Sequence, residues 1–210
     1  MKKLIAALLC LMLLCTAAVA ETAERLYTIE NPQTAGSVTG MFTYEVPQEY
    51  HVFTEEYAAE FLSSHTAADL TGLLNSDEAK AQRLLDMLSA IDFSAADYVY
   101  ADDFSANINI QVAYDTGMSQ EFLVEYASLL DSMLTEQTVA MGLSEEDCCP
   151  MGIAPVGNNP MIWYGFSTRF NGVYTYQYMT CDDKGTLFTV SMTGVPQAVE
   201  MAFLESFSVK

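Results

Sequence analysis

The chain of 210 residues carries 28 Asp and Glu residues against 8 Lys and Arg residues, which gives a formal net charge of −20. This charge repels nucleic acid and anionic membranes, so neither is an expected partner. It is typical of a solvated surface that keeps an exported protein soluble, and it favours cationic partners only weakly.

Residues 1–20 have the pattern of a cleavable secretory signal. Lys2 and Lys3 precede an apolar run from Leu4 to Cys15, and the small residues Ala18-Val19-Ala20 follow it before an acidic residue. The apolar run is too short to cross a hydrocarbon core of ~30 Å, which argues against a membrane anchor. We therefore expect a secreted or cell-envelope protein with no transmembrane helix after cleavage.

A lipid anchor on Cys15 is the alternative. Lipoprotein signals have a small residue just before the cysteine, whereas Leu13 and Leu14 precede Cys15 here.

Without the leader, residues 21–210 retain 28 acidic and 6 basic residues, a net charge of −22. That length suffices for the core of one domain and is short for two.

The mature chain is predicted to begin with a flexible arm and to continue as one domain. Residues 21–36 are polar and are interrupted by Asn31-Pro32 and Gly36, which favours a poorly ordered segment. A single α+β domain is expected over residues 37–210. Its first strand is the alternating run from Met41 to Val46.

Two helices follow this strand. Thr54 is a typical N-cap residue, and the two acidic residues after it suit the positive end of a helix dipole. The same signals recur at Ser76. The apolar positions of the two helices are Tyr57, Phe61 and Leu62, then Leu84, Leu85, Leu88 and Ile91.

Two strands and the longest helix come next. The strands are predicted at Tyr98–Ala101 and Asn107–Ala113, and the second alternates apolar with amide side chains, so one of its faces is buried. Ser119 caps the helix and Gly142 ends it. Its core stripe is predicted at Phe122, Tyr126, Leu129, Leu130, Met133 and Leu134.

An antiparallel meander is predicted from Ile153 to Met192, followed by a closing helix that Pro196 opens. The first hairpin of the meander turns at Asn171-Gly172, because both residues tolerate positive φ. This turn sets a register in which Gly165 opposes Tyr178.

The second hairpin turns at residues 182–185, and its predicted register opposes Met179 to Phe188 and Tyr178 to Thr189. Side chains alternate along a strand, so the register decides which residues share a face. The predicted core face consists of Phe166, Phe170, Val173, Met179, Phe188, Val190 and Met192. The opposite face consists of Trp163, Ser167, Arg169, Tyr174, Tyr176, Tyr178, Thr189 and Ser191.

Four features in this order carry a family resemblance over residues 40–210. They are the strand ending in Val46-Pro47, the strand Asn107-Ile108-Asn109-Ile110 before a long helix, the aromatic meander, and the tail Phe203-Leu204-Glu205-Ser206-Phe207. In these four features the chain resembles the PsbP-like and DcrB-like family of exported or lumenal proteins. The resemblance implies an α+β fold, a mostly antiparallel sheet with helices on both faces in a PsbP-like α/β/α sandwich. It also implies a binding or assembly module with no shared catalytic set.

Three cysteines follow the leader: Cys148, Cys149 and Cys181. Adjacent Cα atoms lie ~3.8 Å apart, below the ~4.4–6.8 Å that disulfides usually span, so a bond between the first two would be strained. A bond from this pair to Cys181 is more natural, with Cys149 as the assigned partner, and buried free thiols are the alternative.

The sequence shows no recognisable catalytic or metal-binding motif. His51 and His65 lack metal-ligand spacing, and no Gly-x-Ser-x-Gly elbow occurs. No catalytic residue, cofactor or metal ligand is assigned. A secreted hydrolase whose site is assembled from distant residues, such as His51 with Cys149 or an acid pair, is the alternative function.

Three acidic groups lie in predicted turns. None has the spacing of an EF-hand loop, and Asp is common in turns because its side chain bonds the neighbouring backbone. We interpret these groups as turn residues, with calcium binding as the open alternative. The groups are Asp102-Asp103, Glu145-Glu146-Asp147 and Asp182-Asp183.

The ladder of tyrosines in the meander is the candidate binding surface. Tyrosine offers a large contact area with a polar tip, which suits peptides or glycans, and Arg169 opposite Tyr174 would add a cation–π contact. The alternative is that tyrosine simply favours strands and that a helix covers this face. The leading hypothesis is a noncatalytic exported module that binds an unknown protein, peptide or glycan. Its predicted contact residues are Trp163, Arg169, Tyr174, Tyr176 and Tyr178.

Overall fold

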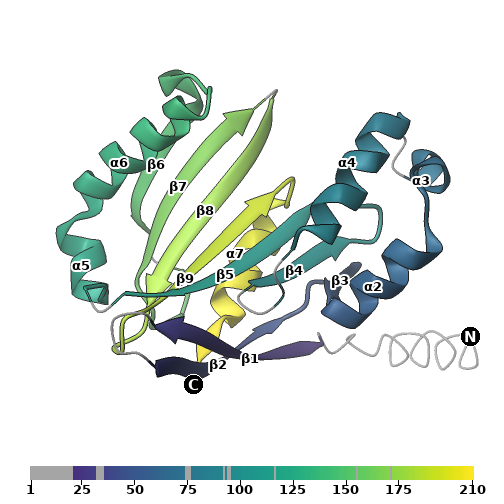
Figure 1. Ribbon diagram of the computed structural model, residues 1–210. Helices are drawn as coiled ribbons and strands as arrows, with labels where there is room; N and C mark the ends of the chain where they lie inside the picture. The colour runs from purple at the N-terminus through teal and green to yellow at the C-terminus, as the bar shows by residue number, and fades with distance from the viewer. Residues whose placement is uncertain are drawn as a thin grey trace, which may run out of the picture.

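The computed structural model describes most of the chain after residue 20, so the predicted signal peptide and Cys15 lie outside the described residues. In the described part, the centre of the fold is an antiparallel sheet of seven strands (Figure 1). The described residues are 21–31, 36–73, 77–91, 93, 96–115, 117–154, 156–170 and 172–210. Across the sheet the strands are, in order, β3 (Tyr50–Phe53), β4 (Ala96–Ala101), β5 (Asn107–Tyr114), β9 (Thr186–Thr193), β8 (Val173–Cys181), β7 (Trp163–Phe170) and β6 (Cys148–Ala154).

One face of this sheet, which we call the α6 face, is covered by helices at its two ends. The helices α2, α3 and α4 lie at the β3–β4 end, and α5 and α6 lie at the β6–β8 end, followed by a 3₁₀ turn, η1 (Figure 1). Their bounds are α2 Glu55–Ser64, α3 Ala67–Leu73, α4 Glu78–Ser89, α5 Gln120–Glu125, α6 Ala127–Ala140 and η1 Glu145–Asp147.

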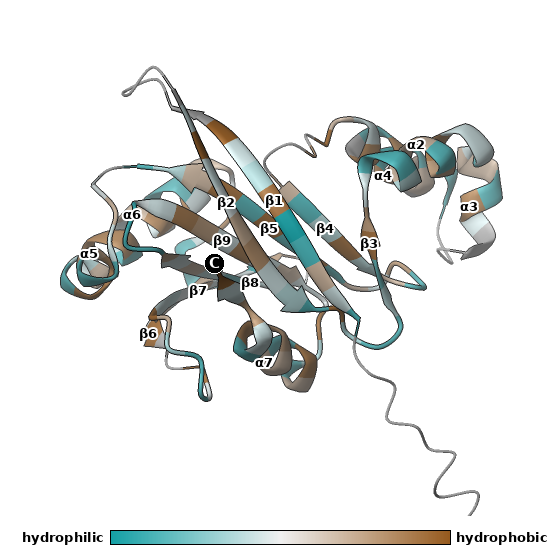
Figure 2. Ribbon diagram, turned by 90° about the horizontal axis from the view of Figure 1, so that it is seen from below, coloured by the Kyte–Doolittle hydropathy of each residue, from teal (hydrophilic) through white to brown (hydrophobic). Residues whose placement is uncertain are grey.

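The other face, which we call the α7 face, is covered by one helix and a small second sheet. Helix α7 (Gln197–Ser206) lies beside the strands β1 (Thr22–Asn31), β2 (Gly36–Glu45) and β10 (Ser208–Val209), which pair in the order β1–β2–β10 (Figure 2). The predicted α+β fold, a mostly antiparallel sheet with helices on both faces, is therefore confirmed. No helix in the described residues is long and apolar enough to cross a bilayer.

The main core lies between the α7 face and the layer that covers it. Alternate residues of β5 and β9 point into this core, and aromatic rings from β1, β2 and α7 pack against them. Phe188, for example, makes an edge-on contact with Phe42, with ring centroids 5.7 Å apart. The fully buried members of this main core include Phe42, Tyr44, Ile108, Ile110, Trp163, Val190, Met192 and Leu204.

The flexible arm predicted over residues 21–36 is wrong for residues 22–31, which form β1. Every residue of this strand opposes one of β2, and Tyr27 is buried. The pattern is hard to see in the sequence because Arg25 interrupts the buried alternation. Its Nε lies 2.8 Å from Asp97 Oδ1, and its guanidinium also donates to the carbonyl of Phe93, so this charge is paired within the core layer.

The first hairpin of the meander has the predicted register, and Gly172 adopts φ +82° as expected. The second hairpin is offset by one residue, so Tyr178 opposes Val190 and Met179 opposes Thr189. The reason is the Asp182 carboxylate, which accepts hydrogen bonds from the backbone N–H groups of Lys184 and Thr186, at 2.9 and 2.8 Å. These bonds close the loop one residue tighter than predicted.

The offset divides the predicted core face between the two sides of the sheet. Phe188, Val190 and Met192 are buried on the α7 face, whereas Phe166 and Met179 are buried on the α6 face. Phe170 and Val173 oppose each other at the hairpin tip, where they are 63% and 50% exposed. Thr189 and Ser191 correspondingly lie on the α6 face.

The predicted longest helix is broken at Tyr126 into α5 and α6. Leu130 and Leu134 of the predicted stripe do pack against the core, whereas elsewhere the buried positions are shifted by one residue from the prediction. Adjacent positions along these helices are both apolar, so periodicity alone cannot select which stripe faces the sheet. The residues in contact with the core are Leu123, Ala127, Leu130 and Leu134, whereas Tyr126, Leu129 and Met133 are exposed.

The predicted bond between Cys149 and Cys181 does not form, and Cys148, Cys149 and Cys181 are all free thiols. Cys149 opposes Ser167 and so lies on the α7 face. Cys181 lies on the α6 face, in the small core beneath α5. The sheet itself therefore separates the two sulfur atoms.

Alkylation of the native protein is expected to modify Cys149 and to leave Cys181 unmodified. Cys149 is exposed, whereas burial, together with the charges of Asp182 and Asp183, raises the pKa of Cys181 to about 11. Both low access and a small thiolate fraction slow its reaction. Mass spectrometry after treatment at pH 8 measures the difference, and a denatured sample should be modified at both cysteines. A disulfide-linked peptide in the digest would contradict this assignment.

Candidate functional site

The structure separates the five predicted contact residues into a buried group and an exposed group. All five lie on the α7 face, as the register of the first hairpin predicted. Trp163 is fully buried and Tyr178 is 2% exposed, so both are core residues. Tyr176 is half-buried, Tyr174 is 45% exposed, and Arg169 is exposed at the hairpin end. A single continuous aromatic surface is therefore not present, and the ladder runs from solvent into the core.

At the exposed end, Tyr174 and Tyr176 form a stacked pair. Their ring centroids are 6.0 Å apart and their planes are inclined by 16°. The guanidinium carbon of Arg169 lies 6.0 Å from the Tyr174 centroid, at the outer limit of a cation–π contact. The predicted contact between Arg169 and Tyr174 is therefore present at long range.

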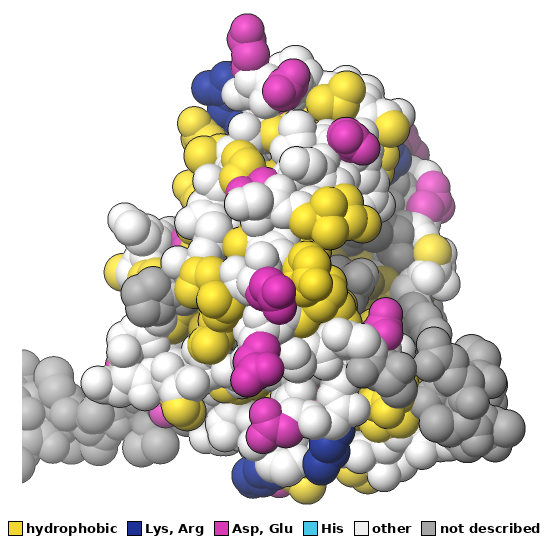
Figure 3. All heavy atoms as spheres, turned by 90° about the vertical axis from the view of Figure 1, so that its left-hand side faces the viewer, with side chains coloured by type: hydrophobic (Ala, Val, Ile, Leu, Met, Phe, Trp, Pro, Cys, Tyr) yellow, Lys and Arg dark blue, Asp and Glu magenta, His cyan; other side chains and the backbone are white. Residues whose placement is uncertain are grey.

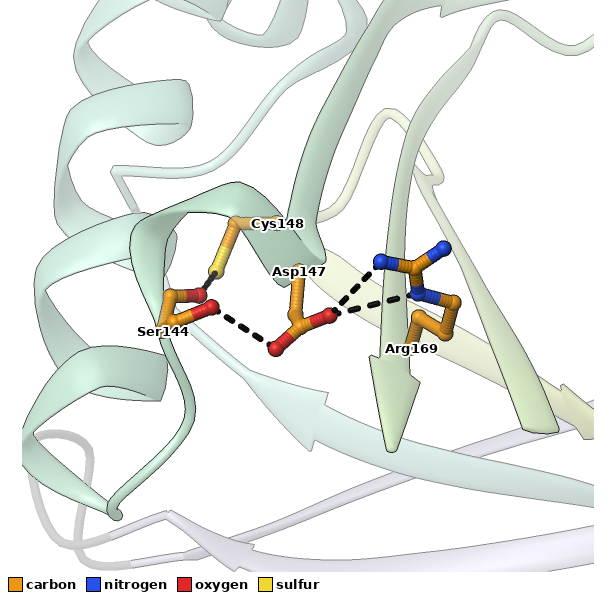
Figure 4. Close-up of polar contacts among 4 residues, drawn as sticks. All are labelled: Ser144, Asp147, Cys148 and Arg169. Atoms are coloured by element: carbon orange, nitrogen blue, oxygen red, sulfur yellow. Dashed lines mark hydrogen bonds and ion pairs between the residues drawn. The ribbon is translucent and has the colours of Figure 1, made fainter. Parts of the chain in front are cut away.

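Arg169 is held in place by a short chain of polar contacts from η1 (Figure 4). Its Nε and Nη2 both donate to Asp147 Oδ1 at 3.2 Å, and Ser144 Oγ donates to Asp147 Oδ2 at 2.7 Å. The Ser144 hydroxyl and the Arg169 guanidinium together hold the pKa of Asp147 below its usual range. The arginine charge at the exposed end is thus already balanced by this carboxylate.

Beyond Tyr176, the ladder enters a cleft between β8 and α7. The cleft has a volume of about 340 Å³, at the lower end of the ~300–1,000 Å³ that is common for ligand sites. Its walls combine apolar and aromatic side chains with two polar ones, Gln197 and Glu200. They include Met151, Val156, Tyr176, Tyr178, Val195 and Met201.

One charged side chain lines this cleft. Glu200 of α7 is 4% exposed, and the Tyr178 hydroxyl donates a hydrogen bond to its Oε1 atom. Among the described residues Glu200 takes part in no ion pair. Burial and the neighbouring Glu200 raise the pKa values of Tyr176 and Tyr178, so both phenols stay protonated. The cleft therefore holds one carboxylate, two phenol hydroxyls and the amide of Gln197 among apolar side chains.

Two local backbone features shape the cleft opposite α7. The pairing of β6 with β7 shifts register between Pro150 and Gly152, and Met151 is the extra residue of this bulge. Bulges often redirect a side chain beside a functional site. Gly165 opposes Tyr178, and a Cβ there would lie 3.1 Å from Met151 Cβ and 3.3 Å from the tyrosine ring. The missing side chain leaves room for both neighbours.

The sequence reasoning did not identify Glu200, although a signal for it exists. Helix α7 buries Phe203 and Leu204, and Phe207 follows in the same stripe at the three-and-four spacing of a core face. Glu200 occupies the position one turn before this stripe. A lone acid on the buried stripe of a short helix marks a residue held in place for a reason other than apolar packing.

No family model matches the sequence, and no curated protein matches it. Three solved structures share 10% sequence identity with the chain. One is a protein from Bacteroides thetaiotaomicron, with a TM-score of 0.36; the match covers 88% of this chain and 48% of that one, so the chain spans about half its length. The second is the T6SS immunity protein TplEi of Pseudomonas aeruginosa, with a TM-score of 0.40 and coverages of 88% and 97%. The third is LpqN, involved in cell envelope biogenesis of Mycobacterium tuberculosis, with a TM-score of 0.38 and coverages of 90% and 92%.

Another hollow, of about 450 Å³, lies near the C-terminus, but its polar groups already bond one another. The Asn159 side chain donates to the carbonyls of Leu204 and Phe207, and Asn158 donates to Glu205. Such a network fixes the chain end and satisfies its own donors and acceptors. In the α7 cleft, by contrast, a buried charge has a single neutral partner.

The outer side of α5 and α6 is a second exposed apolar surface. Figure 3 faces this side and shows apolar side chains interspersed with acidic ones. It is a helix surface, whereas the cleft encloses a buried charge, so we place the candidate site in the cleft. The exposed apolar residues on these helices are Val124, Tyr126, Leu129, Met133 and Val139, and the exposed acids are Glu121, Glu125 and Glu136.

The structure does not bring His51 and Cys149 together. They lie on β3 and β6, the two edge strands of the seven-stranded sheet, which at ~4.8 Å per strand are roughly 25–30 Å apart. The nearest acid to His51 is Asp102, whose Oδ1 lies 3.3 Å from Nε2 at an exposed position. His65 stacks on Phe61 at the end of α2. The proposed pairing of His51 with a cysteine nucleophile is therefore wrong.

The predicted turn acids do bond their own backbone. Asp182 does so as described above, and Asp103 Oδ1 accepts a hydrogen bond from the N–H of Ser105 at 2.9 Å. In the part of the chain that the structure describes, no group of three or more His, Cys, Asp and Glu side chains is arranged to hold a metal ion. The turn interpretation is confirmed for Asp103 and Asp182.

Replacing Glu200 with glutamine is expected to raise the free energy of unfolding at pH 7 by about 1–2 kcal/mol. The amide oxygen can still accept the Tyr178 hydrogen bond, while the cost of burying an unpaired charge is removed. Urea unfolding of both proteins measures the change. Glu136→Gln, at an exposed position on α6, is the control and should leave the midpoint unchanged. A large loss of stability in Glu200→Gln would show that the charge itself stabilises the fold.

Proposed function

We propose that this protein is a noncatalytic binding or assembly module, exported to the cell envelope or the extracellular space, that binds a protein, peptide or glycan segment in the cleft beside α7. The observation that supports this proposal is the graded tyrosine ladder. Tyr174 offers an exposed ring, Tyr176 lies at the cleft, and Tyr178 holds Glu200 at its floor. An aromatic entrance that leads to a buried charge is suited to recognition of one polar group on a larger ligand.

The export part of the proposal rests on the leader over residues 1–20 and on the acidic composition of the chain. We also propose a place in the PsbP-like and DcrB-like family, which the order of elements supports. An early strand, an asparagine-rich strand before the α5–α6 helices, and the aromatic meander follow one another as the resemblance implies.

Peptide and glycan arrays with the purified mature protein test the binding function. A specific set of ligands should be retained, and Tyr176→Ala should weaken their binding by at least tenfold, because truncating a central aromatic contact typically costs about 2 kcal/mol. Leu129→Ser, on the exposed side of α6, is the matched control and should bind as the wild type does. If the Tyr176→Ala variant binds the same ligands as tightly as the wild type does, the binding site lies outside this cleft. Reproducible turnover in a hydrolase screen would instead favour the alternative function.

A further inference from the structure

We propose that the cleft beside α7 binds a primary alkylammonium group, with Glu200 as its counter-ion. This inference rests on the proposed function, since it names the chemistry of the group bound in the same cleft. Four features of the described residues support it: an unpaired buried charge, the geometry of its free oxygen, the character of the cleft walls, and the exposed entrance.

The charge of Glu200 has no counter-ion within the described structure. Residues 21–210 hold only 6 Lys and Arg residues against 28 acids. Arg25, Arg169 and Lys210 are engaged with Asp97, Asp147 and Glu24. An ionised carboxylate that is almost fully buried is costly to keep without a cation. A cationic ligand would supply the missing charge.

The geometry of the carboxylate favours an ammonium over a guanidinium. Tyr178 uses one acceptor position of Oε1, so Oε2 has the larger acceptor capacity left for a ligand. An arginine fork binds a carboxylate best through two parallel hydrogen bonds, which needs both oxygens. An ammonium is a compact charge and binds well to a single oxygen. Because one acceptor position of Oε1 is already used, the site favours the compact ammonium over the two-oxygen arginine fork.

The walls of the cleft suit a flexible alkyl chain that carries such a cation. Met151 and Met201 offer adaptable apolar surface, against which a methylene stem can pack. Tyr176 lines the same cleft, and burial together with the charge of Glu200 raises its pKa, which keeps the ring neutral. A neutral phenol ring attracts a nearby cation through its face.

The entrance indicates how a larger ligand could present the ammonium. Tyr174 stacks on Tyr176 outside the cleft and is 45% exposed. A lysine side chain entering the cleft would leave its peptide backbone beside this ring, whereas a free alkylamine would contact only the cleft. The two sources of the same chemistry therefore differ in their need for Tyr174.

Isothermal titration calorimetry with four small probes tests the inference. n-Butylammonium and N-α-acetyl-L-lysine amide should bind, and N-α-acetyl-L-norleucine amide, which is neutral and of similar length, should bind at least tenfold more weakly. N-α-acetyl-L-arginine amide should also bind more weakly than the lysine probe. Equal binding of the lysine and norleucine probes would overturn the inference without the need for any variant.

Variants locate the charge and identify the source. Glu200→Gln should weaken lysine-probe binding at least tenfold, whereas Glu205→Gln, an exposed acid on the same helix, should not. If the source is a lysine side chain, Tyr174→Ala should weaken binding of a lysine-containing peptide and leave n-butylammonium binding unaffected. If the source is a free amine, Tyr174→Ala should affect the binding of neither probe. Unchanged binding in Glu200→Gln would overturn the inference. If array ligands require Tyr176 but n-butylammonium does not compete with them, the binding function stands and the ammonium assignment fails.

Discussion

Replacing Trp163 with alanine is expected to lower the free energy of unfolding by about 3–5 kcal/mol. The indole is fully buried on the α7 face and meets Phe207 edge-on, with ring centroids 5.4 Å apart. Truncation would leave a cavity between the sheet and α7. The side chains around this cavity are held by their own packing and cannot move in to fill it. Urea unfolding followed by far-ultraviolet circular dichroism measures the loss.

Two further variants make this test specific. Tyr174→Ala, on the same face but at the exposed end of the ladder, should change stability by less than about 1 kcal/mol. Trp163→Phe should cost less than the alanine variant, because the indole Nε1 is buried without a hydrogen-bond partner among the described residues. Equal losses for Trp163→Ala and Tyr174→Ala would contradict the assignment of one residue to the core and the other to the surface.

Replacing Arg25 with leucine is expected to lower the free energy of unfolding by about 2 kcal/mol. Removing one partner of a buried ion pair commonly costs ~3–5 kcal/mol, and the side chains of Arg25 and Asp97 are 24% and 12% exposed, which reduces the effect. The variant leaves Asp97 with only the Tyr44 hydroxyl, at 3.1 Å, while burial already raises the pKa of this carboxyl.

The loss in Arg25→Leu should also depend on pH in a defined direction. Without the guanidinium, the pKa of folded Asp97 should rise further above its unfolded value, because only Arg25 and Tyr44 oppose the effect of burial. The folded variant then binds more protons than the unfolded chain just above the usual Asp pKa, so its stability falls as pH rises through that window. Arg25→Leu should therefore be destabilised most at neutral pH and least near pH 4.

The matched control is Arg169→Leu, which breaks the pair with Asp147 at the surface. The side chains of Arg169 and Asp147 are 47% and 29% exposed, so solvent screens their attraction and the unfolding midpoint should change little. A similar loss of stability in both arginine variants would contradict the conclusion that the ion pair between Arg25 and Asp97 fixes β1 to the large sheet.

The sequence predicted most elements of the main sheet because their signals are local. Thr54 and Ser119 are observed N-caps whose hydroxyls accept from residues three positions on. The pair Gly165 and Tyr178 follows from the turn at 171–172, since a two-residue hairpin loop fixes the register of its strands. In these places one or two residues determine the geometry, and the sequence displays them directly.

The structural predictions were wrong where the geometry depends on a side chain outside the local sequence pattern. The Asp182 carboxylate tightened the second hairpin by one residue, and this exchanged the faces of Phe188 and Val190. β1 was missed because Arg25 points toward the large sheet, where it pairs with Asp97 in a contact between distant segments. Helix α3 was also missed, since it is short and has weak end signals.

Prediction of the candidate site needs both local sequence signals and contacts between distant segments. Tyr174, Tyr176 and Tyr178 could be placed on one face from the first hairpin alone, but their burial depends on where α7 packs. The cleft itself is formed between β8, the β6 bulge at Met151 and α7, which are far apart in the sequence. Glu200 acquires its role only from this packing.

Nuclear magnetic resonance of the mature protein with 13C-methyl-labelled methionine tests most directly whether the cleft beside α7 is the binding site. Met151 and Met201 line the cleft, whereas Met133 and Met141 are exposed around α6. On titration with N-α-acetyl-L-lysine amide, the methyl signals of Met151 and Met201 are expected to shift to saturation, and those of Met133 and Met141 to stay in place. Shifts confined to Met133 and Met141, or shifts of Met151 and Met201 that persist unchanged in Glu200→Gln, would contradict the account.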